Sequence, residues 1–432
     1  MPTRVYAELY GCAASMADGE IALGLLRERG AEIVDSPDKA DINMIVTCAI
    51  KGPTSDRMIS RIRKLRGYGK PLIVAGCMAS GEPGKVVRSA PDAYLIPPKE
   101  ITRITSVFES IIGTSPHDGH NGNGVKLGLP RVRRNPVVAI VPVSEGCRWS
   151  KCSFCIVPRT RPGYGSYPIR MILEEARKSL EEGCREVWLT SQDMGSYGLE
   201  SGRNLLPELL EAINMLEGSF YVRVGMMNPI YLRPILDKLI SSFKGEHIFK
   251  FLHLPVQSGS DKVLKSMNRG HSSRLYLEIV ERFRRSIPEL TLMTDIIVGY
   301  PTEDELDFEE TLEVVWKSEP DSVNVSRFFP RPGTPAWRSR PLPPDVVARR
   351  TRVLNEVCGE VSLRRNERWV GWTGEALVDE AGMKRGTWIS RNYAYKPIVL
   401  HSDENMLGRL VEVEITEAKP HFLYGKIVSR VG

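Results

Sequence analysis

The chain has 432 residues, enough for two or three domains that each bury a core of their own. Hydrophobic residues make up 42% and charged residues 26% of it, which is ordinary for a globular protein and argues against a disordered one. No apolar run is long enough to span a bilayer, and the start lacks a signal-peptide pattern, so we expect neither a membrane nor a secreted protein. Eight cysteines in a chain this long indicate a reducing cytoplasm with metal-bound thiolates, while the net charge of +6 excludes little.

Residues 1–113 alternate short apolar runs with helical segments. The plausible helices are Ala17–Arg29 and Thr54–Leu65, and the strand candidates are Val5–Tyr10, Ile42–Thr47, Leu72–Ala75 and Ala93–Ile96. This alternation predicts a small α/β domain with a largely parallel sheet.

Three of these strands end in a cysteine: Cys12, Cys48 and Cys77. Because the carboxyl ends of parallel strands lie along one edge of a sheet, we expect the three thiols to meet there. Any one of them alone would be read as an ordinary buried cysteine. Their shared position, two of them directly after a glycine, favours an iron–sulfur cluster with three thiolate ligands and one open coordination position.

Residues 114–136 are first polar and glycine-rich and then basic, which predicts an exposed linker. We expect His117 and His120 to be solvated loop residues rather than metal ligands. Between Lys126 and Arg161 the sequence holds eight Lys or Arg residues against one acid, Glu145. Such a run is either a solvated face or the approach path of a phosphate-rich substrate.

Residues 137–335 contain a longer β/α alternation, with one clear helix between Pro168 and Gly183. The strand candidates are Val137–Val143, Glu186–Thr190, Tyr221–Met226, Lys250–Leu254, Leu292–Val298 and Ser322–Phe328. Six such units predict a partial barrel of parallel strands with its active site at the C-terminal strand ends. Polar residues follow the strands where that site should lie: Ser191–Asp193, Asn228, His253, Gln257, Ser258, Asp295 and Gly299–Glu303.

The first of these strands leads into a loop that carries Cys147, Cys152 and Cys155. Three thiols within nine residues can converge on one soft metal centre, and a cubane cluster held by only three of them keeps one iron open. The alternatives are a structural zinc loop or a set of free buried thiols. Zinc usually takes four ligands in such loops, and no nearby histidine supplies the fourth.

Residues 336–368 form an arginine-rich helical connector, and residues 369–432 hold short strand candidates. The strand candidates are Thr373–Val378, Thr387–Tyr393, Lys396–Leu400, Leu410–Thr416 and Tyr424–Val428, which predict a small antiparallel barrel or sandwich. Its aromatic residues Trp388, Tyr393, Tyr395 and Phe422 either stack on nucleic-acid bases or pack in the core. Cys184 and Cys358 are isolated, and we expect both to be ordinary buried residues.

Taken together, these motifs resemble the radical S-adenosylmethionine (SAM) methylthiotransferase family over nearly the whole chain. The motifs that carry the resemblance are Tyr-Gly-Cys12, Val-Thr-Cys48-Ala, Ala-Gly-Cys77-Met, the loop from Cys147 to Cys155, Leu-Thr-Ser-Gln192-Asp-Met-Gly-Ser-Tyr-Gly, Arg223-Val-Gly-Met-Met-Asn228-Pro, Leu-His253-Leu-Pro-Val-Gln257-Ser-Gly-Ser, Asp295-Ile-Ile-Val-Gly-Tyr-Pro-Thr-Glu303 and Phe328-Phe-Pro-Arg-Pro-Gly-Thr. One feature departs from the family: four residues, rather than three, separate Cys147 from Cys152. We expect a bulge to absorb the extra residue.

The resemblance implies an α/β fold made of a flavodoxin-like open sheet, a partial (β/α)6 radical-SAM barrel and a C-terminal TRAM β-domain. It implies two [4Fe-4S] clusters. The first, on the catalytic residues Cys147, Cys152 and Cys155, would bind SAM and cleave it reductively. The second, on Cys12, Cys48 and Cys77, would supply the sulfur. The residues implied to contact SAM are Gln192 and Asp193 near its methionine part, Gln257 and Ser258 near the ribose, Ile297, Val298 and Gly299 beside adenine, and Asn228.

The motifs around Gln192 and Asn228 are most similar to the archaeal and eukaryotic branch of the family. That branch methylthiolates N6-threonylcarbamoyladenosine at position 37 of tRNA. The resemblance thus implies a cytoplasmic enzyme whose partners are tRNA and an electron donor such as a ferredoxin or flavodoxin, with no role for DNA or a membrane. The alternatives are a methylthiotransferase for isopentenyladenosine in tRNA or for a ribosomal protein, and a non-catalytic iron–sulfur RNA-binding protein.

Overall fold

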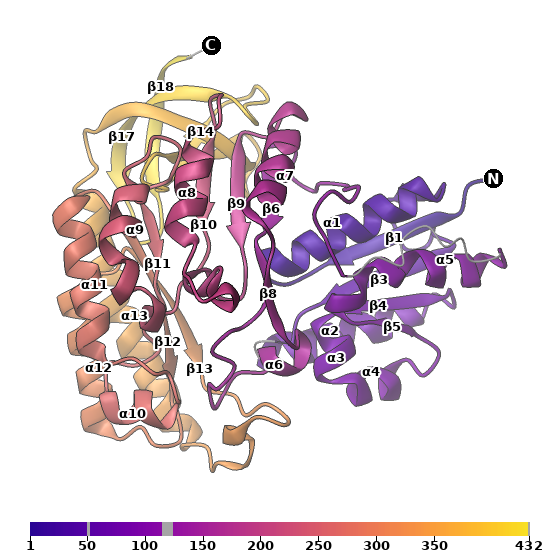
Figure 1. Cartoon of the computed structure of the whole chain (residues 1–432), viewed down its shortest axis with the longest axis horizontal. Coiled ribbons are helices and arrows are strands. Elements are labelled where there is room, and N and C mark those ends of the chain that lie inside the picture. Colours follow the sequence, from indigo (N-terminus) through magenta and orange to yellow (C-terminus); the bar gives the residue numbers. More distant parts are fainter. Residues whose placement is uncertain (50–51, 115–123, 431–432) are drawn as a thin grey trace.

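The computed structural model describes residues 1–49, 52–114 and 124–430. Figure 1 shows an N-terminal α/β unit on the right, a larger β/α body in the centre and left, and a C-terminal β-barrel at the top. None of the described helices combines the length and apolar character needed to cross a membrane. The α/β class and the three kinds of unit expected from the sequence are confirmed.

The N-terminal unit is a five-stranded parallel sheet in the order β2-β1-β3-β4-β5, the flavodoxin-like order. Its strands are β1 (Arg4–Leu9), β2 (Glu32–Val34), β3 (Ile42–Thr47), β4 (Leu72–Gly76) and β5 (Tyr94–Ile96). Its helices are α1 (Ala13–Glu28), α2 (Gly52–Arg66), α3 (Cys77–Gly81), α4 (Pro83–Ser89), the 3-10 turn η1 (Pro98–Arg103) and α5 (Ile104–Ile112). Separate apolar clusters lie on the two faces of the sheet, which is why β3 is buried at every position.

The central body is a partial barrel made of two three-stranded parallel sheets, as predicted. One sheet holds β6 (Val138–Pro142), β9 (Glu186–Thr190) and β10 (Tyr221–Val224), and the other holds β11 (Phe251–His253), β12 (Thr291–Val298) and β13 (Ser322–Arg327). A parallel bridge between Val222 and Ile248 joins the two sheets. A short hairpin of β7 (Ser144–Gly146) and β8 (Tyr164–Ser166), which the sequence did not predict, follows β6.

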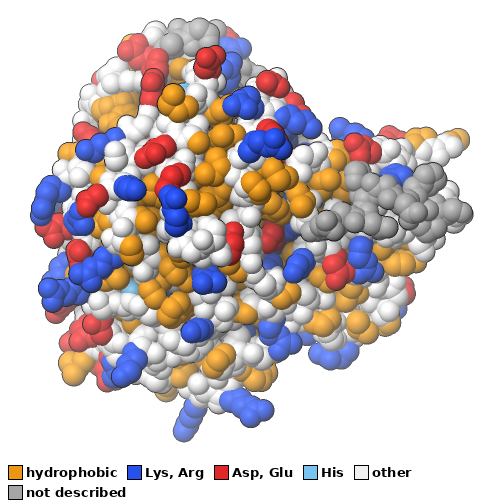
Figure 2. Space-filling view, viewed as in Figure 1, with side chains coloured by type: hydrophobic (Ala, Val, Ile, Leu, Met, Phe, Trp, Pro, Cys, Tyr) orange, Lys and Arg blue, Asp and Glu red, His pale blue; other side chains and the backbone are white. Residues whose placement is uncertain are grey.

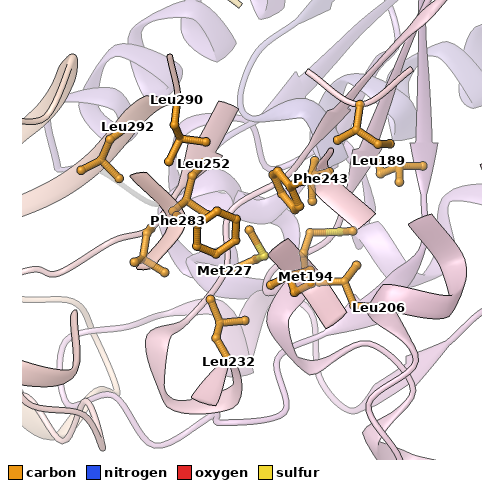
Figure 3. Close-up of a cluster of buried hydrophobic side chains, with 14 of the residues drawn as sticks. Leu189, Met194, Leu206, Met227, Leu232, Phe243, Leu252, Phe283, Leu290 and Leu292 are labelled. Atoms are coloured by element: carbon orange, nitrogen blue, oxygen red, sulfur yellow. The ribbon is translucent and has the colours of Figure 1, made fainter. Parts of the chain in front are cut away.

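Helices cover the outside of this barrel and bury its largest apolar cluster. They are α6 (Val157–Thr160), α7 (Ile169–Glu181), α8 (Leu206–Asn214), α9 (Leu236–Phe243), α10 (Asp261–Ser266), α11 (Ser273–Ser286) and α12 (Glu305–Ser318), with 3-10 turns η2 (Met194–Ser196), η3 (Leu199–Ser201), η4 (Pro229–Tyr231), η5 (Arg233–Ile235) and η6 (Pro335–Arg338). Figure 3 shows strand residues such as Leu189 and Leu252 meeting Phe243 and Phe283 from the helices. The two phenyl rings meet edge to face, 5.3 Å apart.

The long helix α13 (Pro344–Glu367) leads into a closed barrel in the order β14-β15-β16-β18-β17. Its strands are β14 (Thr373–Ala381), β15 (Thr387–Asn392), β16 (Pro397–His401), β17 (Leu410–Ala418) and β18 (Leu423–Arg430). The predicted antiparallel pairing holds except between β16 and β18, which pair in parallel to close the barrel.

Buried charges attach this barrel to the rest of the molecule. The Asp321 carboxylate, at the start of β13, accepts from Lys396 of the barrel at 2.8 Å and from Arg365 of α13 at 3.1 Å. Burial opposes ionisation of Asp321, but Lys396 and Arg365 outweigh it and lower the pKa of the carboxyl. The barrel, α13 and the β/α body therefore share one ion-paired centre.

The aromatic residues of the C-terminal barrel mostly pack inside the protein. Tyr395 is 8% exposed and lies 4.8 Å from the rings of both Phe249 and Phe251. Trp388 and Tyr393 are partly buried against the barrel core. Base stacking by Tyr395 is therefore excluded in this conformation, because its ring is already covered.

The expectation of exposure holds for only part of the described residues 124–136: Val125, Gly128, Arg134 and Pro136 are exposed, but Lys126 is 1% and Leu127 is 5% exposed. His117 and His120 lie outside the described residues. Part of the basic run from Lys126 to Arg161 is used internally, because Lys126, Arg131 and Arg161 are buried in ion pairs. Its exposed members are Arg134, Arg148, Lys151 and Arg159. Figure 2 shows Lys and Arg side chains scattered among acidic ones over the visible face.

Candidate active site

The three N-terminal cysteines lie at the carboxyl ends of β1, β3 and β4, which are neighbours in the sheet. The hydroxyl of Ser15 lies 3.8 Å from the Cys12 sulfur and 4.0 Å from the Cys77 sulfur, so it links these two thiols. A Cβ placed on Gly11 would lie 3.4 Å from the Cβ of Cys48, which puts that thiol beside Cys12 as well. The predicted convergence of three distant cysteines is therefore seen in the structure.

The glycines before two of these cysteines are required by the backbone. Gly11 has φ +123° and Gly76 has φ +90°, conformations that residues with a Cβ rarely adopt. A Cβ on Gly76 would also lie 2.6 Å from the carbonyl oxygen of Thr47. Each glycine lets the chain turn sharply from strand into helix and places its cysteine at the helix start.

The second trio, Cys147, Cys152 and Cys155, lies in the loop closed by the β7–β8 hairpin. Hydrogen bonds pin this loop to the segment after α10: the Ser153 amide donates to the Met267 carbonyl at 2.9 Å, and the Trp149 indole donates to the Asn268 carbonyl at 2.6 Å. The Arg269 guanidinium lies 3.4 Å from the Cys152 sulfur. The loop is thus held from outside its own sequence.

The extra residue of this loop is accommodated as a local turn. Ser150, between Cys147 and Cys152, has φ +40°, in the left-handed region. The amide of Asn268 donates to the carbonyl of the neighbouring Lys151 at 3.1 Å and holds the turn. The extra residue therefore alters the turn between Cys147 and Cys152, while the three cysteines stay in one loop.

Each trio offers three cysteine thiols, the donor set of an iron–sulfur cluster. Among the described residues, no group of three His, Cys, Asp or Glu side chains is placed to hold one metal ion. A cubane cluster distributes its thiolates over separate iron atoms, so its ligands lie farther apart than those of one ion. Burial raises the pKa of Cys77 and Cys147, and it raises the pKa of Cys155 to about 12. A metal centre would have to displace these protons on binding.

A direct contact joins the helices that adjoin the two cysteine sites. The hydroxyl of Ser80, in α3 directly after Cys77, donates to the carbonyl of Thr160 at 3.0 Å. Thr160 ends α6, which begins two residues after Cys155. A Cβ on Gly81 would lie 2.7 Å from the Thr160 methyl group, so the helices touch closely. Figure 1 shows α3 and α6 side by side at the lower centre.

Residues expected to bind SAM partly meet at one rim of the barrel. The Asp193 carboxylate accepts from the Gly195 amide at 3.0 Å and from the Asn228 amide at 2.9 Å, tying the loops after β9 and β10 together. Burial raises the pKa of Asp193 to about 6. Its Oδ2 and the Oε1 of Gln192 are buried, and no donor among the described residues reaches them. Two unpaired acceptors at this rim fit a ligand that carries an ammonium group.

The other expected contacts divide into two groups. Gln257 adopts φ +75° and is bonded to β12 through its amide, which donates to the Asp295 carbonyl at 2.8 Å. Ser258 is 1% exposed, and its hydroxyl lies 3.3 Å from that of Thr311 in α12, away from the rim. Val298 is 1% exposed in the core between strands and helices, so only its backbone can face a cofactor.

The remaining two members of that segment lie on either side of Val298. Ile297 and Phe154 of the cysteine loop both pack against a small apolar cluster that contains Tyr300 and is separate from the main core. The Gly299 amide donates to the Glu303 carboxylate at 3.1 Å, which fixes the turn after β12. Ile297 is therefore the member that shares an apolar cluster with a residue of the cysteine loop.

A polar group lies across β11, β12 and β13. His253 and Asp295 are joined at 3.0 Å, and the Asn324 amide donates to the other oxygen of Asp295 at 2.7 Å. The side chains of His253 and Asp295 are 13% and 17% exposed, so both are partly accessible. Because side chains alternate between the two faces of a strand, these polar residues share one face of the sheet, and the apolar residues between them face the helices.

Three arginines near the cysteines were missed as site residues by sequence reasoning. They are Arg161, Arg269 and Arg331, all less than 9% exposed. Arg331 lies in the motif that begins at Phe328, but a motif alone does not show which cysteine site a side chain faces. A buried arginine gives no periodic signal, so only its partners identify it.

The chain matches three family models in order: an uncharacterized protein family, UPF0004, over residues 4–96, the radical SAM superfamily over 141–315, and the TRAM domain over 367–428. It is 38% identical over 430 residues to the "Probable threonylcarbamoyladenosine tRNA methylthiotransferase" of Pyrococcus horikoshii, covering 99% of this chain and 100% of that protein. The chain belongs to the threonylcarbamoyladenosine tRNA methylthiotransferase family.

Other members of the threonylcarbamoyladenosine tRNA methylthiotransferase family match over the same span. The human protein of that name is 30% identical, covering 99% of this chain and 74% of that protein. Among solved structures, the radical SAM methyltransferase TsrM from Kitasatospora setae has a TM-score of 0.56 at 13% identity, over 78% of this chain and 77% of that one. This second likeness shows a shared fold.

Proposed function

We propose that the protein transfers a methylthio group to C2 of adenine in N6-threonylcarbamoyladenosine at position 37 of tRNA. Membership of the family supports the substrate and the reaction. The observation that carries the proposal is the Ser80–Thr160 contact, which connects the helices that follow Cys77 and Cys155. A reaction that needs sulfur from one centre and a radical from another requires two such sites at one junction.

The chemistry explains why the reaction needs cofactors. An aromatic C–H bond is too weakly acidic for a side-chain base, so radical chemistry must replace proton abstraction. When bound, the two [4Fe-4S] clusters and SAM supply the electron, the radical and the sulfur. Cys147, Cys152 and Cys155 would hold the cluster that binds SAM, and Cys12, Cys48 and Cys77 the cluster that holds sulfur.

The side chains around these sites position the reactants. Asp193 and Gln192 present buried acceptors to the amino group of SAM, and Asn228 orients Asp193 through its amide. Ile297 and Phe154 of the cysteine loop line one side of the site with apolar surface, because both pack against the same small cluster. His253, Asp295 and Asn324 present a polar wall that suits the urea and threonine groups of the modified base.

The proposal includes tRNA, an electron donor of the ferredoxin or flavodoxin type, and a cytoplasmic location. The TRAM barrel and the exposed arginines of α13 supply contacts for RNA phosphates. A reducing compartment is needed because the reaction depends on thiolate ligands, and all eight cysteines are free of disulfides.

The test compares nucleosides of tRNA from cells with and without the gene for this chain. We expect 2-methylthio-N6-threonylcarbamoyladenosine to disappear in the deletion strain and N6-threonylcarbamoyladenosine to accumulate. Loss of a methylthio group from isopentenyladenosine, or from a ribosomal protein, would support the other branches instead. Anaerobic assay for 5′-deoxyadenosine separates an enzyme from a non-catalytic binder, which makes none.

A further inference from the structure

Arg331 reaches from the β/α body to the N-terminal unit. It lies in the loop after β13, its side chain is 2% exposed, and its Nη1 is 3.5 Å from Glu82 Oε1. Glu82 directly follows α3, the helix that begins with Cys77. The Phe329 ring lies 5.3 Å from the guanidinium carbon and covers one face. Arg331 therefore lies where the two units meet, at the cysteine site of the N-terminal unit.

One edge of this guanidinium has no acceptor. Its Nη2 is buried, and among the described residues nothing accepts a hydrogen bond from it. Glu82 does not fill this role, since its other oxygen already contacts Ser55 and Lys85. A buried donor of a charged group left unpaired is costly, so its presence calls for an anionic partner.

The contact with Glu82 places this guanidinium beside the helix that begins with Cys77. Burial lowers the pKa of Arg331, while Glu82 and then Cys48 act in the opposite direction, so Cys48 lies within electrostatic range of the guanidinium. Arg161 flanks the same site, beside Cys77 and Cys12. Its guanidinium, however, is bound by Asp18 and Glu145. Of these two arginines, only Arg331 retains a free edge.

We propose that Arg331 binds the anionic sulfur of the N-terminal site: its Nη2 edge holds a hydrosulfide or methanethiolate brought to the open coordination position on Cys12, Cys48 and Cys77. The assignment rests on the proposed function. A planar guanidinium offers several directed donors to a large anion, whereas a lysine ammonium acts as a point charge. The β/α body thus contributes a residue to the sulfur site of the N-terminal unit.

The experiment uses the full chain with Cys147, Cys152 and Cys155 changed to alanine, so that only the N-terminal cluster is loaded. Sodium hydrosulfide and methanethiolate are titrated anaerobically, and binding is followed by electron paramagnetic resonance. We expect Arg331→Met to weaken sulfur binding at least tenfold, about 1.4 kcal/mol, and Arg331→Lys to weaken it less. Loss of the positive charge should also lower the cluster potential; a tenfold change in the reduction equilibrium is about 59 mV for one electron.

Two controls separate sulfur binding from attachment of the units. Arg338→Met removes an exposed arginine near the same loop and should change neither readout. Glu82→Gln removes the ion pair but leaves Nη2, so it should lower the melting temperature and keep sulfur affinity. Unchanged affinity and potential in iron-loaded Arg331→Met would overturn the assignment and leave Arg331 as an interdomain contact. A parent variant that binds no iron at this site would instead overturn the proposed function and the assignment together.

Discussion

The ammonium group of Lys126 lies 2.6 Å from the Asp18 carboxylate, and both side chains are 1% exposed. The same ammonium is 2.9 Å from Glu145, and Arg161 donates to both carboxylates. Asp18 lies in α1 just after Cys12, while Glu145 and Arg161 bracket the cysteine loop of the barrel. One buried ion cluster therefore connects the two cysteine sites.

Lys126→Met should destabilise the protein by about 3–5 kcal/mol, because it removes one of the two cations that pair with Asp18 and Glu145 and leaves Arg161 alone between two carboxylates. Urea unfolding measures this free energy. Lys70→Met, at an exposed position, is the matched control and should change it little. If the two variants had the same free energy of unfolding, the buried ion cluster would contribute nothing to stability.

Replacing one cysteine of either trio should lower the amount of bound iron. Cys12→Ala and Cys147→Ala should each lower bound iron by roughly half, because each trio loses its cluster when one of three thiolates is removed. Only Cys147→Ala should abolish 5′-deoxyadenosine formation in the absence of tRNA. If Cys184→Ala lowers iron equally, the assignment of ligands is wrong, since Cys184 is buried in the main core.

Asp193→Asn should weaken SAM binding by about one to two powers of ten, the size of a hydrogen bond to a charged group. Because burial raises the pKa of Asp193 to about 6, the carboxyl becomes protonated as the pH falls through that value. SAM affinity in the unmodified chain should therefore fall below pH 6, and in Asp193→Asn it should not. Equilibrium dialysis at pH 5 to 8 tests both statements.

Glu186 should make folding stability depend on pH. Burial first, and then the charge of Asp379, raise the pKa of Glu186 to about 8, while Trp188, Arg391 and Arg223 act against them. A raised folded-state pKa gives stability that is complete below the unfolded value near 4.5 and is lost as the pH rises to about 8. Glu186→Gln should therefore gain on the order of 1–3 kcal/mol at pH 8 relative to pH 5.

Thermal unfolding across this pH range measures the effect. The exposed Glu211→Gln serves as the control and should follow the parent at every pH. A parallel pH dependence of Glu186→Gln and parent would show that the carboxyl is ionised in the folded protein.

The strands and the cysteine sites were predictable because their signals are local. β3 and β9 match the predicted runs residue for residue, since a buried parallel strand is mostly apolar. The N-terminal trio followed from one topological rule about strand ends. Family motifs supplied Gln192 and Asp193, whose buried acceptors the structure then places at the rim.

What sequence could not supply are the long-range pairings of charged residues. The sequence predicts an exposed linker at Lys126 because residues 114–124 before it are polar and glycine-rich, yet its partners Asp18 and Glu145 come from two different units. Tyr395 was open to base stacking until the Phe249 and Phe251 rings covered it. Such contacts depend on how the units pack against each other, which no local pattern contains.

The ion-paired centre at Asp321 has a consequence for substrate selection. Lys396 and Arg365 fasten the TRAM barrel to the strands that carry His253 and Asp295, so the barrel cannot swing as a tethered module. An RNA bound by the barrel would therefore be held at a fixed distance from the active site. The distance between the barrel and the active site would then select the nucleotide by its position along the anticodon arm, before its chemical groups are recognised.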